Sequence, residues 1–172
     1  MAERGSKGKS NGRRESFLSA LVSTPTLGDN DDAITKLCKF NFKFFTYEVD
    51  VTQNFNEWTQ PELSELFSSL QNFSAESLEY WKNTTAGPKR TPYLLIYDGF
   101  PPEEKTKLSG PSKSVPKEAK WARFRLDTTK RLIGFVIPEE FAVSAKEMSA
   151  TIFDSNCFYV VYLDRDHNFY SS

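Results

Sequence analysis

Apolar and polar residues follow strand-like patterns in four stretches of the chain. In residues 39–51 (KFNFKFFTYEVDV), aromatic and aliphatic side chains alternate roughly with polar ones, which is the pattern of a half-buried strand. Three shorter apolar runs follow at residues 121–126, 132–137 and 158–163. We therefore expect four strands, with a tight hairpin connection at residues 127–130.

Between the first two predicted strands the apolar residues recur at helical spacing. Residues 59–62 (TQPE) have the form of a capping box, with a hydroxyl at the N-cap and a glutamate three residues later. A helix is expected from there to Phe73, and Ser74 is expected to cap a second helix that presents Leu78 and Trp81. The pattern predicts an α+β fold, in which two consecutive helices pack on an antiparallel sheet of about four strands.

The composition divides the chain into three parts. Residues 1–16 are rich in Gly, Ser, Lys and Arg, so we expect a disordered basic tail. Residues 17–38 are expected to be a linker or docking segment. Residues 39–172 are expected to form a single α+β domain, because this length and a total of 15 Phe, 7 Tyr and 3 Trp can fill one core. Within this domain, residues 98–116 are rich in Pro, Gly, Ser and Lys and predict an exposed loop.

Several classes of function are not indicated by the sequence. The only cysteines, Cys38 and Cys157, lack metal-ligand spacing, so we expect neither a zinc site nor a disulfide framework. No apolar run approaches the length of a membrane span, and the N-terminal residues lack the apolar core of a signal peptide. We therefore expect a cytoplasmic protein without membrane partners and without a cofactor.

Basic residues concentrate in the second half of the chain. The net charge is −1, but residues 89–131 contain eleven basic and five acidic residues. In the predicted strand 121–126, alternation places Arg123 and Arg125 on one face, and the hairpin brings Arg131 beside them. Three guanidinium groups on one face suit a phosphate-bearing ligand. The competing interpretation is a solvated strand face.

His167 is the only histidine, and it follows the last predicted strand. An imidazole can act as a general acid or base near neutral pH. The alternative is an inert histidine in a polar turn. Asp164 and Asp166 lie close to it in the sequence, but no further His or Cys supports a transition-metal site, so no metal is expected.

Three motifs together resemble the RelE/YoeB-type toxins of bacterial toxin–antitoxin pairs, small ribonucleases that cut messenger RNA on the ribosome. In that family a strand of alternating basic and hydrophobic residues leads through a short turn into Arg-Leu-Val-Tyr, and the YoeB branch ends in His-Tyr. Here residues 123–126 (RFRL) lead into residues 131–135 (RLIGF), and residues 167–170 read HNFY. The predicted order of elements is also the family's. The chain differs in its greater length, its low pI and its longer closing motif.

The resemblance implies a metal-independent endoribonuclease of toxin–antitoxin or phage-defence type. Arg131 would contact the scissile phosphate, and His167 would protonate the leaving 5′-oxygen after attack by the neighbouring 2′-hydroxyl. The implied partners are RNA or the ribosome, and a protein such as an antitoxin. The candidates for RNA binding are Arg123, Arg125, Lys113, Lys120 and Tyr170, and those for the general base are Lys113, Lys117, Glu118 and Lys120.

Two other functions remain open at this point. The chain can be a non-catalytic adaptor or a subunit of a bacterial defence complex that keeps a toxin-like fold, and the acidic remainder of the chain favours this hypothesis. It can also be a nucleic-acid-binding module without chemistry. That hypothesis is less favoured, because the basic face is not interleaved with aromatic residues as a stacking platform is.

Overall fold

The computed structural model describes residues 11–22, 33–141 and 153–170. The chain divides into two units, Met1–Ile34 and Thr35–Ser172. In the first unit, helix α1 (Gly12–Val22) has exposed side chains over residues 12–21. It therefore includes the last residues of the predicted tail 1–16, whereas residues 1–10 lie outside the described part. The short helix α2 (Ala33–Lys36) spans the boundary between the units.

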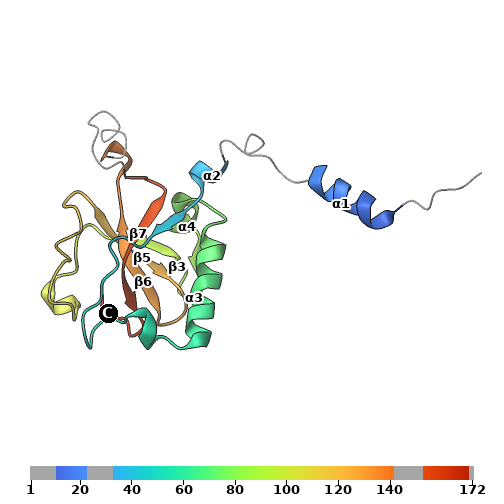
Figure 1. Cartoon of the computed structure of the whole chain (residues 1–172). Coiled ribbons are helices and arrows are strands. Elements are labelled where there is room, and N and C mark those ends of the chain that lie inside the picture. Colours follow the sequence, from blue (N-terminus) through green and yellow to red (C-terminus); the bar gives the residue numbers. More distant parts are fainter. Residues whose placement is uncertain (1–10, 23–32, 142–152, 171–172) are drawn as a thin grey trace, which may run out of the picture. The chain divides into compact units, whose positions relative to one another are not determined.

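The larger unit is built on a mixed five-stranded sheet with the strand order β1-β7-β6-β5-β4 (Figure 1). Strands β4 to β7 pair antiparallel, and β1 pairs parallel with β7. A separate hairpin joins two further strands, β2 and β3. The strands are β1 (Lys39–Asn41), β2 (Thr85–Ala86), β3 (Thr91–Pro92), β4 (Leu94–Ile96), β5 (Lys120–Arg125), β6 (Arg131–Val136) and β7 (Cys157–Asp164).

The predicted four-stranded antiparallel sheet was therefore wrong in strand number and in direction. Only the first three residues of the predicted strand 39–51 pair in the sheet. Regular pairing then stops, since Phe40 packs against Phe158 on one side of the sheet whereas Phe44 packs against Phe135 on the other. Beyond this point Thr46 still donates a backbone hydrogen bond to Val161 of β7 at 2.9 Å. The fifth strand, β4, comes from an apolar stretch too short to be recognised as a strand.

The two consecutive helices were predicted correctly. Helix α3 (Gln60–Phe73) begins at the predicted capping box, where the Thr59 backbone N–H donates to the Glu62 carboxylate at 2.8 Å. Helix α4 (Leu78–Asn83) is capped by Ser77, whose hydroxyl accepts from the Tyr80 N–H at 3.1 Å. The expected cap, Ser74, instead ends α3, because its N–H still bonds to a carbonyl of that helix. Two 3-10 helices, Phe55–Glu57 and Glu103–Lys105, lie in the connections.

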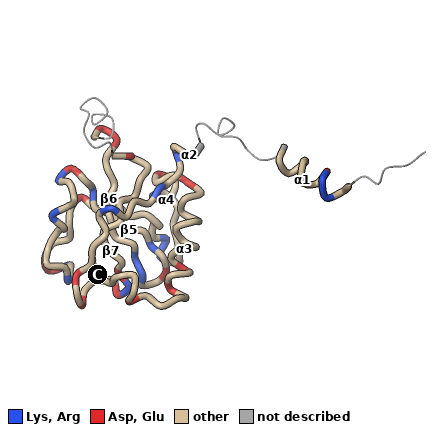
Figure 2. Tube along the Cα trace, in the orientation of Figure 1, with Lys and Arg blue, Asp and Glu red and all other residues tan. Residues whose placement is uncertain are grey.

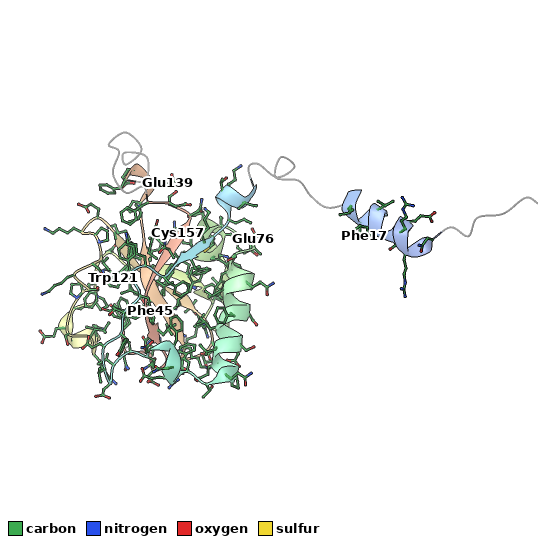
Figure 3. The ribbon with its side chains drawn as sticks, in the orientation of Figure 1. Phe17, Phe45, Glu76, Trp121, Glu139 and Cys157 are labelled. Carbon is green, nitrogen blue, oxygen red and sulfur yellow. The ribbon has the colours of Figure 1, made fainter. Side chains whose placement is uncertain are left out.

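Each face of the sheet carries its own apolar layer. Helices α3 and α4 cover one face, where Phe73 stacks on Phe124 with ring centroids 4.5 Å apart (Figure 1). On the other face Trp121 packs with Phe135 and Phe169, and Figure 3 shows Trp121 on the side away from α3. In the described residues, connecting segments with no α-helix cover this second face. A polar site can therefore open there beside the core.

Candidate functional site

A pocket of about 690 Å³ opens on the loop-covered side of the sheet, where β4, β5 and β6 meet the hairpin of β2 and β3. We call it the arginine pocket. It contains five of the nine residues that the sequence singled out for catalysis or RNA binding. Its lining residues are Pro88, Lys89, Thr91, Leu95, Tyr97, Arg123, Arg125, Thr128, Arg131, His167 and Tyr170.

The pairing of β5 and β6 gathers the three arginines. Arg125 lies opposite Arg131 in the register of the two strands. Arg123 is two residues earlier in β5, so its side chain is on the same face as that of Arg125. The intervening residue, Phe124, faces the other way and is fully buried in the layer beneath α3. Alternation of side chains along β5 thus places charge on the pocket side and an aromatic ring in the core.

Arg131 is held by the turn that precedes it. Its guanidinium donates to the backbone carbonyls of Asp127 at 2.9 Å, Lys130 at 2.8 Å and Thr128 at 3.1 Å. Only 6% of the residue is exposed, and its Nε has no hydrogen-bond partner among the described residues. Burial, together with the nearby charges of Arg123 and Arg125, lowers the pKa of Arg131 to about 10. The cation is thus held in an unfavourable environment.

The other two arginines are bound to different extents. Arg125 donates to the Asp127 carbonyl at 3.0 Å and to the Thr91 hydroxyl at 2.6 Å. Arg123 has one bond, from Nε to the Tyr97 hydroxyl at 3.1 Å, and its buried Nη1 has no partner among the described residues. Among the described residues, Arg123 therefore has the fewest hydrogen bonds of the three arginines and the most donors left for a ligand.

No carboxylate balances these charges at close range. Among the described residues, none of the three guanidinium groups has an Asp or Glu oxygen within 4.0 Å. In Figure 2 the basic residues appear as blue segments of β5 and β6. Three cations around one partly enclosed space create a positive potential that favours an anionic ligand.

His167 reaches the arginine pocket from the turn after β7. Its backbone is left-handed, with φ of 62°, and its side chain is half-buried. The Asp164 carboxylate fixes the turn, because it accepts from the backbone N–H groups of Asn168 at 2.8 Å and Phe169 at 2.9 Å. The sole histidine and the three arginines therefore face one space.

Two tyrosines complete the wall next to Arg123. Tyr97 and Tyr170 stack with ring centroids 5.3 Å apart and planes 8° apart. Burial raises the pKa of the Tyr97 hydroxyl, although Arg123 acts in the opposite direction. Tyr97 is therefore a neutral phenol near pH 7, able to donate to an oxygen ligand while it accepts from Arg123.

Comparisons of the chain with family models, curated proteins and solved structures gave no match. The likeness to RelE/YoeB toxins therefore rests on the motif residues alone.

The remaining candidates lie outside the arginine pocket. Lys113 and Lys117 are exposed in the loop before β5, as is Glu118. Lys120 is exposed at the start of β5 and lines a different pocket with Glu79 and α4. None of the four proposed general bases thus lies beside His167. Among the described residues, no group of three or more His, Cys, Asp or Glu side chains is arranged to hold a metal ion.

Six lining residues were missed by sequence reasoning, and Tyr97 and Lys89 are two of them. Tyr97 belongs to the apolar stretch 93–97, and pairing of Leu95 with Arg123 puts Tyr97 on the arginine side of the sheet. Alternation would have found it, had this stretch been recognised as a strand. Lys89 comes from the tight turn between β2 and β3, and no pattern in the sequence links that turn to β5.

Proposed function

We propose that the arginine pocket binds the phosphodiester backbone of RNA and that the protein is a metal-independent endoribonuclease. The observation that carries this proposal is that the only histidine lines the same pocket as three guanidinium groups, which have no carboxylate oxygen within 4.0 Å in the described part of the chain. A bound phosphate would accept from the arginines and reduce their mutual repulsion. The imidazole would then be next to the phosphate oxygens.

The pocket contains two of the groups that RNA transesterification uses, a proton donor and cations that can bind the phosphate. The 2′-hydroxyl attacks phosphorus, the bond from phosphorus to the 5′-oxygen breaks, and a protonated His167 gives its proton to that oxygen. Solvent accepts the proton of the 2′-hydroxyl. Arg131 and Arg123 stabilise the charge that develops on the phosphate oxygens. The products are a 2′,3′-cyclic phosphate and a 5′-hydroxyl, and general acid catalysis contributes about 10²–10⁴-fold.

The proposed partners follow from this chemistry. RNA, free or on the ribosome, would enter the arginine pocket, with Tyr170 offering a flat ring beside the phosphate site. A ribonuclease of this kind acts in the cytoplasm, where a protein such as an antitoxin would restrain it. No helix in the described part of the chain is long and apolar enough to cross a membrane.

A second candidate function is a non-catalytic adaptor or defence-complex subunit. The observation in its favour is that Arg125 and Arg131 already donate to backbone carbonyls of the turn at residues 127–130. These bonds stabilise the hairpin and account for two of the three arginines without any ligand. They do not account for Arg123 or for the position of His167.

Expression in bacteria separates the two functions. We expect the wild-type protein to arrest growth and fragment transcripts, and we expect His167→Ala and Arg131→Ala to relieve both effects. Lys113→Ala is the control, because this exposed lysine lies outside the pocket. An adaptor predicts that all four proteins behave alike, in which case the nuclease proposal fails.

A further inference from the structure

One buried carboxylate lies next to both Arg131 and the turn that carries His167. Asp164 is the last residue of β7 and is 1% exposed. It lies opposite Arg131 in the register of β6 and β7, and its charge acts on Arg131 in the direction opposite to burial. Its two oxygens are used for the turn that carries His167. The same residue therefore lies opposite Arg131 and holds the turn that carries His167.

The turn needs such support because its backbone is strained. A non-glycine residue in the left-handed region is uncommon, and His167 has this conformation. The two residues that follow it, Asn168 and Phe169, are buried. Each oxygen of Asp164 accepts one backbone N–H from the residues directly after the histidine. Asn168 adds a third anchor, because its side-chain amide donates to the Val51 carbonyl at 2.7 Å. The backbone that carries the imidazole is thus tied down on its C-terminal side.

We propose that Asp164 is the positioning residue of the site, which holds His167 in a fixed place relative to Arg131. This inference rests on the proposed function. Asp164 does not touch the substrate. It acts through the turn, so that the proton donor meets the leaving oxygen of a phosphate bound at the arginines. A carboxylate is required because only an acceptor with two free oxygens satisfies both N–H groups.

A positioning role predicts a separation between catalysis and binding. In Asp164→Asn, one oxygen becomes an amide that cannot accept the second N–H, so the turn loosens while the arginines keep their own contacts. We expect kcat on a short single-stranded RNA to fall at least tenfold and KM to stay within twofold. Arg123→Met should instead raise KM, because the phosphate loses one of its guanidinium partners.

Two further variants control for general loss of stability. Asp154→Asn is the matched control, because Asp154 also accepts a backbone N–H, from Asn156 at 2.8 Å, but lies beyond the other end of β7. It should leave kcat and KM unchanged. Asn168→Ala removes the Val51 anchor and serves if Asp164→Asn does not fold. It should lower kcat in the same way.

A second measurement keeps this inference distinct from the proposed function. Because the chain has one histidine, NMR signals from labelled imidazole report on His167 alone. Inorganic phosphate should shift these signals in the wild type and leave them unshifted in Asp164→Asn, with equal phosphate affinity by calorimetry. If the wild type shows this response but cuts no RNA, the proposed function fails and the positioning role stands. The positioning role would be overturned if Asp164→Asn kept the wild-type kcat or gave the same NMR shifts as the wild type. It would also be overturned if phosphate did not shift the imidazole signals of the wild type.

Discussion

At the scale of single residues, the three arginines of the pocket differ in how much structure depends on them. Within the part of the chain that the structure describes, Arg125 and Arg131 each make three hydrogen bonds, whereas Arg123 makes one. A buried cation with an unused donor destabilises a fold unless a ligand compensates it. Replacing Arg123 should therefore affect ligand binding more than the stability of the fold.

We predict that Arg123→Met weakens RNA binding without weakening the fold. Affinity should fall at least about tenfold, because a charged hydrogen bond to phosphate is lost. The slope of log affinity against log salt should become shallower by about 0.7 for single-stranded RNA. Fluorescence anisotropy at several salt concentrations measures the affinity and its salt dependence, and a thermal melt measures the stability of the fold. Lys113→Met is the control, and equal losses in the two variants would contradict the assignment.

His167 offers a second test at the residue scale, because its φ of 62° suits glycine better than histidine. We predict that His167→Gly leaves the free energy of unfolding unchanged or raises it by about 1 kcal/mol. RNA cleavage should fall 100-fold or more. Chemical denaturation and a cleavage assay give the two values. A destabilised His167→Gly protein would indicate that the histidine is retained for packing.

At the scale of elements, the close packing of β6 on β7 depends on Gly134. The register shifts between Ile133 and Gly134, and the glycine lies directly against the backbone of Tyr159. A Cβ at this position would overlap the Tyr159 carbonyl and the ring of Phe158. Neither can move without displacing β7, which carries Asp164 and the His167 turn.

We therefore predict that Gly134→Ala destabilises the protein by about 2 kcal/mol or more. Urea denaturation would measure the change. Gly99→Ala is the matched control, since nothing lies within 4 Å of a Cβ there. If the two variants unfold at the same urea concentration, the close approach of the strands is not as described.

The elements show which parts of the fold were predictable from sequence. The capping box at residues 59–62 acts locally, so it placed the start of α3. Side-chain alternation is also local, and it put Arg123 and Arg125 on one face. The parallel pairing of β1 with β7 joins residues more than a hundred positions apart, and no local pattern encodes it. Residues 39–51 alternate like one long strand, but Phe40 and Phe45 pack in one layer, Phe44 packs in the other, and further apolar residues of the segment are exposed.

The candidate site was predictable to a similar extent. The arginines were found because they share a strand and its hairpin partner. His167 was grouped with them by resemblance, and the structure places it in the same pocket. Lys113 and Lys120 were included for charge alone, and loop conformation takes Lys113 elsewhere. Tyr97 and Lys89 depend on packing between distant elements.

At the scale of the whole molecule, the sheet buries groups that ionise only in strong alkali. Burial raises the pKa of Cys38 from 9.0 to about 12, and that of Cys157 from 9.0 to about 11. It also raises the pKa of Tyr159 from 10.0 to about 12. Above pH 9 the unfolded chain therefore releases protons that the folded chain retains, so deprotonation favours unfolding.

We predict that the melting temperature is insensitive to these groups below pH 9 and falls as the pH rises from 9 towards 12. Thermal melts at pH 8 and pH 10.5 would show the difference. In Cys38→Ala one of the three groups is absent, so the decline should be shallower. A decline of the same size in that variant would assign the alkaline instability to other groups.

The central claim, that the arginine pocket cleaves RNA through its 2′-hydroxyl, is tested most directly by the products of a single oligonucleotide. The purified protein is incubated in EDTA with an RNA, and with the same RNA carrying one 2′-deoxynucleotide at the mapped cut. We predict a 2′,3′-cyclic phosphate and a 5′-hydroxyl from the first substrate, no cut at the deoxy position in the second, and almost no products with His167→Gly. Failure to cut the RNA, cleavage at the deoxy position, or full activity of His167→Gly would contradict the account.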